Sequence, residues 1–120
     1  MYTVTVEERF LATHRVVLPD GTWEPSHEHD WLVRAWFTAE ELNEYGQVID
    51  FEVAKAALGS VLTELNGTNL NENEAIEGVC PSAELVARYV FQRLRGRGLA
   101  RLRRIEVTEA PGCVASFEVD

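Results

Sequence analysis

The first forty residues alternate in a way that predicts two long antiparallel strands. Residues 2–13 place apolar side chains between threonines and glutamates at every second position, which is the period of a half-buried strand. A second segment, His27–Ala39, is rich in aromatic and β-branched residues. Between them, Leu18-Pro19-Asp20-Gly21 has turn chemistry, because proline presets φ and Asp-Gly tolerates a left-handed step. Strand, turn and strand together predict a hairpin.

The next segment changes to a helical period. Apolar residues in Val53–Leu65 recur at steps of one and three, which predicts a helix with an apolar stripe. Asp50 is the expected N-cap, since its carboxylate can accept from the free amides of the first turn. Asn66-Gly67 is the expected end, with glycine in the left-handed conformation.

The rest of the chain predicts a second helix and two more strands. A polar loop, Thr68–Glu77, leads to a helix over Ser82–Arg95, with its first residue as N-cap and Gly96 as terminator. Strands are expected around Leu102–Thr108 and Val114–Val119. The order ββααββ predicts an α+β fold with two helices on one face of an antiparallel sheet. No repeat or linker divides the chain, so we expect residues 1–120 to form a single domain.

Composition excludes several classes of protein. A formal net charge of −9 argues against a general binder of nucleic acid or of anionic membranes. No apolar run is long enough to cross a bilayer, and the acidic start of the chain is unlike a signal peptide, so a cytoplasmic protein is expected. The two cysteines, Cys80 and Cys113, are far apart, which indicates neither a disulfide framework nor a cysteine zinc site.

Positive charge gathers in one short region. Six arginines lie where the second predicted helix gives way to the following strand: Arg93, Arg95, Arg97, Arg101, Arg103 and Arg104. Both a solvated helix end, where the helix dipole favours cations, and a patch that binds an anion or nucleic acid fit this pattern. Because no aromatic residues are interleaved and the protein is acidic overall, we prefer the first interpretation.

All three histidines lie in the first quarter of the chain. His27 and His29 are two residues apart in a predicted strand, so both rings project from the same face. An antiparallel hairpin would bring His14, at the end of the preceding strand, alongside them. Three imidazoles leave a fourth position for water or substrate, which is typical of a catalytic zinc site, although Ni, Cu and Fe(II) also accept imidazole. The alternative is that these are ordinary surface or core histidines.

Six motifs then follow one another in a recognisable order. They are Phe10-Leu11-Ala12-Thr13-His14, His27-Glu28-His29-Asp30, Gly46-Gln47-Val48-Ile49-Asp50-Phe51, Leu70-Asn71, Pro81-Ser82-Ala83-Glu84 and Glu109. They resemble the F-x-A-x-H, H-G-H-N/D, G-x-V-x-D-F, L-N and P-T-x-E motifs and the pterin-anchoring glutamate of the 6-pyruvoyl-tetrahydropterin synthase family, which includes 6-carboxy-tetrahydropterin synthase. Each motif is weak alone, but the ordered set spans nearly the whole chain.

The resemblance implies a fold, a metal and a ligand. The fold is the tunnelling fold (T-fold), whose ββααββ sheets join into an oligomeric barrel, as a homotrimer or a homohexamer with sites at subunit interfaces. The resemblance also implies that His14, His27 and His29 hold zinc, which activates the hydroxylated side chain of a reduced pterin.

Three further residues are candidates for binding the pterin. Glu109 could accept two adjacent N–H donors of the pyrimidine edge in parallel, and the alternative is a surface strand glutamate. Ser82 and Glu84 are either substrate-binding residues or ordinary helix-capping chemistry.

The chain departs from the family at the residues that transfer protons. Trp23 stands where the family has a catalytic cysteine, and Asn66 and Gly67 replace an Asp-His pair. None of these three can transfer a proton near neutral pH. Glu24 remains a candidate base, because Glu24–His29 resembles a branch of the family in which glutamate replaces the cysteine and dihydroneopterin triphosphate is cleaved to a 6-hydroxymethyl pterin. The alternative for Glu24 is a solvated loop acid.

Two functions remain open from the sequence. The first is a zinc-dependent lyase, with Glu24 as its base, acting on the side chain of a reduced pterin such as dihydroneopterin triphosphate. The second is a catalytically lapsed homologue that binds zinc and a pterin or purine-like ring. A purely structural oligomer would explain neither the histidines nor Glu109. Neither cysteine is assigned a role, since buried inert thiols are common.

Overall fold

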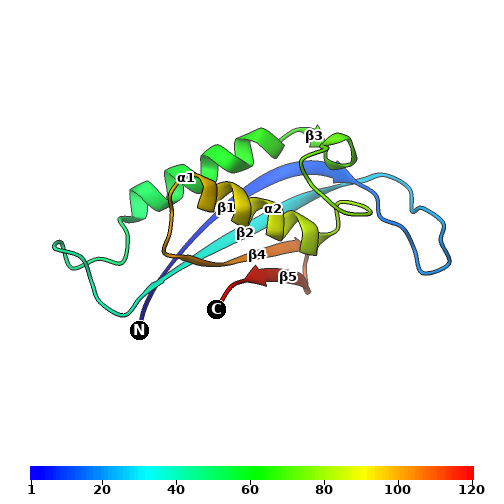
Figure 1. Ribbon diagram of the computed structural model, residues 1–120. Coiled ribbons are helices and arrows are strands. Elements are labelled where there is room, and N and C mark those ends of the chain that lie inside the picture. The colour runs from blue at the N-terminus through cyan, green and yellow to red at the C-terminus, as the bar shows by residue number, and fades with distance from the viewer.

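The predicted hairpin is the longest element of the fold. In the computed structural model, which describes residues 1–120, strand β1 (Tyr2–His14) pairs antiparallel with β2 (His27–Ala39) along its whole length. Strand β4 (Leu102–Ala110) pairs antiparallel with β2, and β5 (Cys113–Glu118) pairs antiparallel with β4 (Figure 1). Because the β1–β2 register places His14 opposite His27, the hairpin brings the ends of its two strands together at the histidines.

A short strand on the far side of β1 was not predicted. Strand β3 (Thr68–Asn69) pairs in parallel with Ala12 and Thr13, and a 3-10 helix, η1 (Leu70–Glu72), follows it directly. The sheet order is therefore β3-β1-β2-β4-β5, and the sheet is mixed rather than wholly antiparallel. The expected polar loop over Thr68–Glu77 is wrong at its start, because two residues are too few to show a period and their partner lies far away in sequence.

The first helix begins and ends as its sequence predicts. Helix α1 (Phe51–Leu65) starts after Asp50, whose carboxylate accepts from the amides of Glu52 and Val53. Gly67 has a φ of +75°, the left-handed conformation expected where the chain leaves the helix.

The second helix ends slightly later than expected. Helix α2 (Ala83–Gly96) is capped by Ser82, whose hydroxyl accepts from the amide of Leu85. Gly96 is the last helical residue and not the terminator. The chain turns instead at Gly98, which has a φ of +87° and donates its amide to the Arg95 carbonyl.

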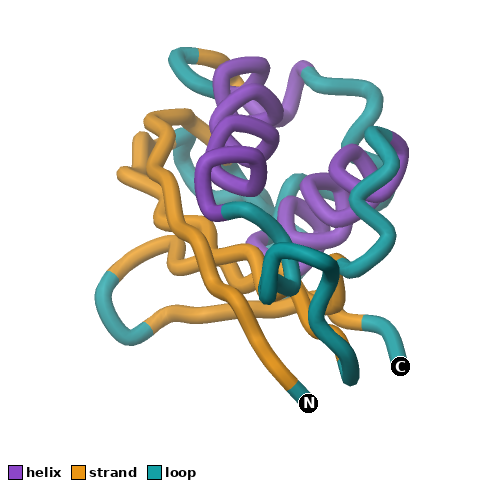
Figure 2. The backbone as a smooth tube through the Cα atoms, turned by 90° about the vertical axis from the view of Figure 1, so that its left-hand side faces the viewer, coloured by secondary structure: helices purple, strands orange, loops and turns teal.

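Both helices cover one face of the sheet, and the core lies between the two layers (Figure 2). Its buried apolar side chains come from α1, α2 and the inward positions of β1, β2 and β4. Phe10 and Trp31 stack with ring centroids 5.6 Å apart at the end of the core nearest the histidines. Trp31 is fully buried and donates its indole N–H to the Ala12 carbonyl, so this end of the hairpin is held by packing and by a hydrogen bond.

The opposite face of the sheet carries charged side chains in mutual contact. Arg34 reaches both Glu7 and Glu106, and Arg9 pairs with Asp30. The Arg9–Asp30 and Arg34–Glu7 pairs are exposed enough to contribute little stability alone. Neither helix has the length and apolar character that crossing a bilayer requires.

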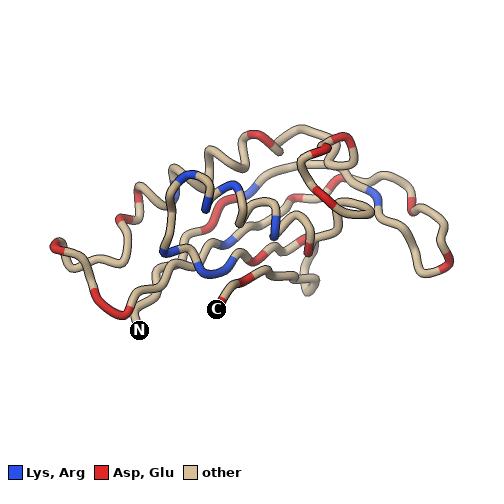
Figure 3. Tube along the Cα trace, in the orientation of Figure 1, with Lys and Arg blue, Asp and Glu red and all other residues tan.

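Figure 3 shows positively charged residues gathered along α2 and the turn into β4, and several of these side chains make contacts within the chain. Arg93 and Arg97 both contact the Glu64 carboxylate. Arg95 donates to the Leu102 carbonyl, and Arg101 donates to the Val48 carbonyl. These contacts agree with a helix end and leave few guanidinium groups free for an anion.

Candidate metal centre

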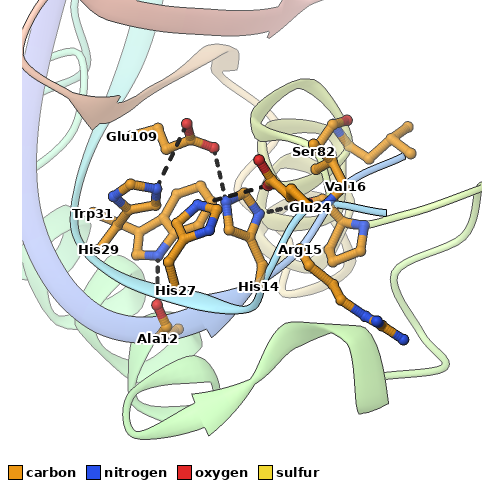
Figure 4. A network of polar contacts seen from close by, with 12 residues as sticks. Ala12, His14, Arg15, Val16, Glu24, His27, His29, Trp31, Ser82 and Glu109 are labelled. Atoms are coloured by element: carbon orange, nitrogen blue, oxygen red, sulfur yellow. Dashed lines mark hydrogen bonds and ion pairs between the residues drawn. The ribbon is translucent and has the colours of Figure 1, made fainter. Parts of the chain in front are cut away.

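Three imidazoles from the two strands of the hairpin meet at one point. His14 ends β1, while His27 and His29 begin β2, and their ligand atoms lie within 4.8 Å of one another. The three rings meet edge to face, with centroids between 4.4 and 5.4 Å apart. The arrangement follows from the strand period and from the register of the hairpin (Figure 4).

Backbone carbonyls fix which nitrogen carries the proton in two of the three rings. His14 Nδ1 lies 2.8 Å from the Pro81 carbonyl oxygen, and His27 Nδ1 lies 3.0 Å from that of Pro25. A carbonyl only accepts, so Nδ1 donates in both rings, and Nε2 has a free lone pair in the neutral form of each ring. The Nε2 atoms of His14 and His29 are buried without a hydrogen-bond partner, which is costly unless something else satisfies them. Two imidazoles whose Nδ1–H groups are held by carbonyls, together with the nearby His29 ring, form a donor set that fits a zinc ion.

Burial favours the neutral form of His29. Desolvation lowers the pKa of this imidazole below its ordinary value, and the neighbouring His27 and His14 lower it further. The carboxylates of Glu109 and Glu24 oppose this shift without reversing it. A histidine that stays neutral to lower pH remains able to bind a metal there.

Two carboxylates flank the imidazoles on different sides. Glu109, near the end of β4, places Oε1 3.0 Å from His14 Nε2 and Oε2 3.7 Å from His29 Nε2. Glu24, in the loop before β2, places Oε1 3.7 Å from His27 Nε2 (Figure 4). With the imidazole proton on Nδ1, the facing atoms of Glu109 and His14 are both acceptors. Their contact therefore becomes favourable only with a second proton or a metal ion.

Glu24 is fixed in place rather than free in its loop. Its side-chain Oε1 accepts from the Val16 amide at 3.1 Å, and its own amide donates to the Val16 carbonyl at 3.1 Å. An isolated bridge between Val17 and Trp23 closes the same loop. These contacts hold the carboxylate at the edge of the histidine cluster, where a proton acceptor could act.

A cavity of about 600 Å³ opens beside the cluster. The residues that line it come from the loop after β1, the start of α2 and the β4–β5 hairpin: Val16, Val17, Cys80, Ser82, Ala83, Glu84, Glu109, Cys113, Val114, Ala115 and Ser116. Glu109 belongs to both the cavity and the cluster, so a ligand in the cavity would lie next to the imidazoles. Ser82 and Glu84, which the sequence singled out, line the same cavity from the first turn of α2.

Trp23, Asn66 and Gly67, which replace the family's proton-transfer residues, lie outside this cavity. Trp23 is 43% exposed, stacks against the Arg15 guanidinium at 5.0 Å and does not line the cavity. The Asn66 side chain accepts from the Leu11 amide, and the Gly67 amide donates to the Leu11 carbonyl. Asn66 and Gly67 therefore secure the outer edge of β1.

Sequence reasoning missed the shape of this cavity. Both cysteines of the chain line it, although they are far apart in sequence and were left without a role. The turn at Pro111-Gly112 brings Cys113 back beside Glu109, since Cys113 pairs with Ala110. Only the β4–β5 pairing reveals this neighbourhood, and no local motif could have done so.

Comparison with known proteins agrees with the fold. The 6-pyruvoyl tetrahydropterin synthase family profile matches residues 3–120. A 6-carboxy-5,6,7,8-tetrahydropterin synthase from Synechocystis sp. is 29% identical over 122 residues, which cover 98% of this chain and 93% of that protein.

Solved structures share the fold at lower identity. The 6-pyruvoyl tetrahydropterin synthase of Caenorhabditis elegans superposes with a TM-score of 0.80 at 21% identity, covering 100% of this chain and 98% of that one. A structure of the Plasmodium vivax 6-pyruvoyltetrahydropterin synthase also reaches 0.80, at 16% identity, covering 99% of this chain and 98% of that one. Together with the family match over almost the entire sequence, these similarities show that the chain belongs to the 6-pyruvoyl tetrahydropterin synthase family.

Proposed function

We propose that this chain is a zinc-dependent lyase acting on the side chain of a reduced pterin such as dihydroneopterin triphosphate. The observation that carries the proposal is the convergence of His14, His27 and His29, with two buried Nε2 atoms that have no hydrogen-bond partner. Membership of a pterin-processing family supports the substrate class.

The three histidines would hold the metal through Nε2. Pro81 and Pro25 accept the Nδ1 protons of His14 and His27, which orients both rings and raises their basicity as ligands. When bound, zinc polarises the hydroxyls of the pterin side chain and lowers their pKa.

Glu24 is the proposed proton acceptor. Its carboxylate lies 3.7 Å from His27 Nε2, and the Val16 amide holds it there, so it would face a hydroxyl group that binds beside the histidines. The Plasmodium vivax structures describe a glutamate as the catalytic residue of that protein, replaced there by cysteine or alanine. Glu24 would serve the same purpose here, where Trp23 occupies the position of the usual cysteine.

The cavity is the proposed pterin site. Glu109 would accept the paired N–H donors of the pyrimidine edge through its two oxygens. Both oxygens face imidazole Nε2 atoms in the present structure. The Glu109 oxygens would be available to a ligand once a metal binds the Nε2 atoms of His14 and His29. Ser82 and Glu84 would contact the ring or its substituents from the opposite side of the cavity.

The sheet also supports the proposed oligomer. β3 pairs with β1 only at Ala12 and Thr13, and Asn66 and Gly67 bind Leu11, so residues 2–10 have an open backbone edge, and β5 leaves a second open edge on the other side. Open edges invite pairing with further strands. We propose that copies of this chain join edge to edge as a homotrimer or homohexamer, and light scattering coupled to size-exclusion chromatography would distinguish the two assemblies.

A second candidate function is binding of zinc and a pterin or purine-like ring without turnover. The observation that favours it is the replacement of the family's Asp-His pair by Asn66 and Gly67, which contact Leu11 and cannot relay a proton.

Turnover of dihydroneopterin triphosphate separates the two candidates. Zinc-loaded protein should release a pterin with a shortened side chain, detected by chromatography, and metal-free protein should not. Absence of product with zinc-loaded protein, together with pterin binding measured by calorimetry, would support the binding function instead.

A further inference from the structure

The chain directly after His14 is held by two side chains, one from the following loop and one from a distant part of the sequence. β1 ends at His14, and the next two residues are outside any strand. Glu24 binds the Val16 amide on the β2 side. Asn71, in η1, binds the backbone of Arg15 on the β3 side.

The Asn71 contact has the form of a strand pairing made by a side chain. Its Oδ1 accepts from the Arg15 amide at 2.8 Å, and its Nδ2 donates to the Arg15 carbonyl at 3.0 Å. An asparagine amide carries the same donor and acceptor as a peptide group. The parallel pairing of β1 with β3 stops at Thr13 and Asn69, and Asn71 continues it by one further interaction beyond His14.

Asn71 is itself held in a fixed position. The Asn69 side chain accepts from the Asn71 amide at 3.0 Å and so caps η1. His14 is therefore bracketed on its β3 side by pairing at Thr13 before it and by the Asn71 clamp after it. The ring is fixed separately, through the hydrogen bond from Nδ1 to the Pro81 carbonyl.

We propose that Asn71 is a positioning residue for the metal centre, which sets the backbone of His14 so that its Nε2 meets those of His27 and His29. The inference rests on the proposed zinc site. Asn71 touches neither the metal position nor the cavity, and it acts only through the Arg15 peptide that follows the ligand. Outer contacts of this kind typically change metal affinity by about 10- to 100-fold.

Asn66 provides a matched control on the same strand. Its Oδ1 accepts from the Leu11 amide at 2.9 Å, so it also joins an asparagine amide to the outer edge of β1. That contact lies three residues before His14 and does not involve the peptide next to a ligand. Loss of either contact should lower the free energy of unfolding, but only loss of the Asn71 contact should weaken zinc binding.

The test measures zinc affinity and metal-free stability on the same set of variants. Zinc dissociation constants come from competition with a chromophoric chelator, and Co²⁺ absorption spectra report the ligand geometry. Asn71→Ala should weaken zinc binding by about tenfold or more and alter the Co²⁺ spectrum. Asn66→Ala should leave the zinc affinity and the Co²⁺ spectrum close to wild type. It should lower the thermal midpoint of the metal-free protein by about as much as Asn71→Ala does.

Asn71→Asp keeps the acceptor for the Arg15 amide but loses the donor to the Arg15 carbonyl. It should show an intermediate loss of affinity, and it keeps the test decisive if Asn71→Ala does not fold. Equal zinc affinity in wild type and in every folded Asn71 variant would overturn the positioning role, as would an equal loss in Asn66→Ala. A wild-type protein that binds no zinc would instead overturn the proposed metal site itself.

Discussion

Glu109 Oε1 and His14 Nε2 face each other 3.0 Å apart at the centre of the site, although the proton of this imidazole is committed to the Pro81 carbonyl through Nδ1. His14 is only 1% exposed, so water does not relieve the contact. Two acceptors this close need a positive charge near them, either as a second proton or as a metal ion. The contact therefore fits either a doubly protonated His14 or the metal ion proposed above.

Zinc should stabilise the fold strongly and reversibly. A ligand that binds only the native state, at 100 times its dissociation constant, adds about 2.7 kcal/mol to the free energy of unfolding. We expect chelation to lower the thermal midpoint and added zinc to restore it. His14→Ala should abolish the zinc-dependent shift, and a shift that survived in this variant would contradict the assignment of His14 as a ligand.

Glu24→Gln should remove the proposed proton acceptor without changing the structure of the loop. The glutamine keeps an oxygen to accept from the Val16 amide, so the loop should stay in place, but it cannot take a proton. We expect kcat on dihydroneopterin triphosphate to fall by about 10²- to 10⁴-fold with little change in zinc affinity. Unchanged turnover in this variant would remove Glu24 from the mechanism.

Glu109→Gln should weaken pterin binding more than Glu84→Gln does. Only Glu109 borders both the cavity and the imidazoles, so it is the carboxylate best placed to fix a ring beside the metal. Isothermal calorimetry of the zinc-loaded variants with a pterin measures this directly. A larger loss with Glu84→Gln would transfer the anchoring role to the first turn of α2.

Cys113 should react before Cys80 with a small alkylating reagent. Both thiols line the cavity, but Cys113 is exposed and Cys80 is half-buried. Mass spectrometry after brief treatment with iodoacetamide gives the order of labelling, and a bound pterin should slow labelling at Cys113. Labelling that a saturating pterin does not change would mean that the ligand binds outside this cavity.

His29 should make the metal-free protein sensitive to acid. Because burial lowers the pKa of this imidazole, the folded state binds fewer protons than the unfolded chain does once the pH falls through the ordinary histidine value of about 6.5. The free energy of unfolding should therefore decrease on acidification from about pH 7 to pH 5. Histidine resonances followed by NMR give the pKa directly, and His29→Gln should flatten the pH dependence. A His29 pKa at or above the ordinary value would contradict this prediction.

The local sequence pattern was sufficient to predict the two strands that carry the histidines. A period of two places His27 and His29 on one face of β2, and the antiparallel hairpin brings His14 opposite His27. The caps at Asp50 and Ser82 were also predictable, because each hydroxyl or carboxylate lies just ahead of an apolar helical stripe.

The remaining features depend on contacts between distant segments. β3 has only two residues and is defined by its pairing with β1, so no period could reveal it. The Asn71 clamp on Arg15 joins residues 56 positions apart. The sequence indicated Glu24 as either a catalytic or a solvated acid, and only the Val16 amide in the folded loop shows that its carboxylate is held at the cluster.

X-ray absorption at the zinc K edge of the purified, zinc-loaded protein is the most direct test of the metal centre. We expect one zinc per chain with three imidazole nitrogens at about 2.0–2.1 Å and one oxygen donor, from the water or substrate in the fourth position. A spectrum that shows a Zn–S distance of about 2.3 Å, as Cys80 or Cys113 would give, would contradict the three-histidine site. A zinc-containing protein without imidazole scattering would contradict it as well.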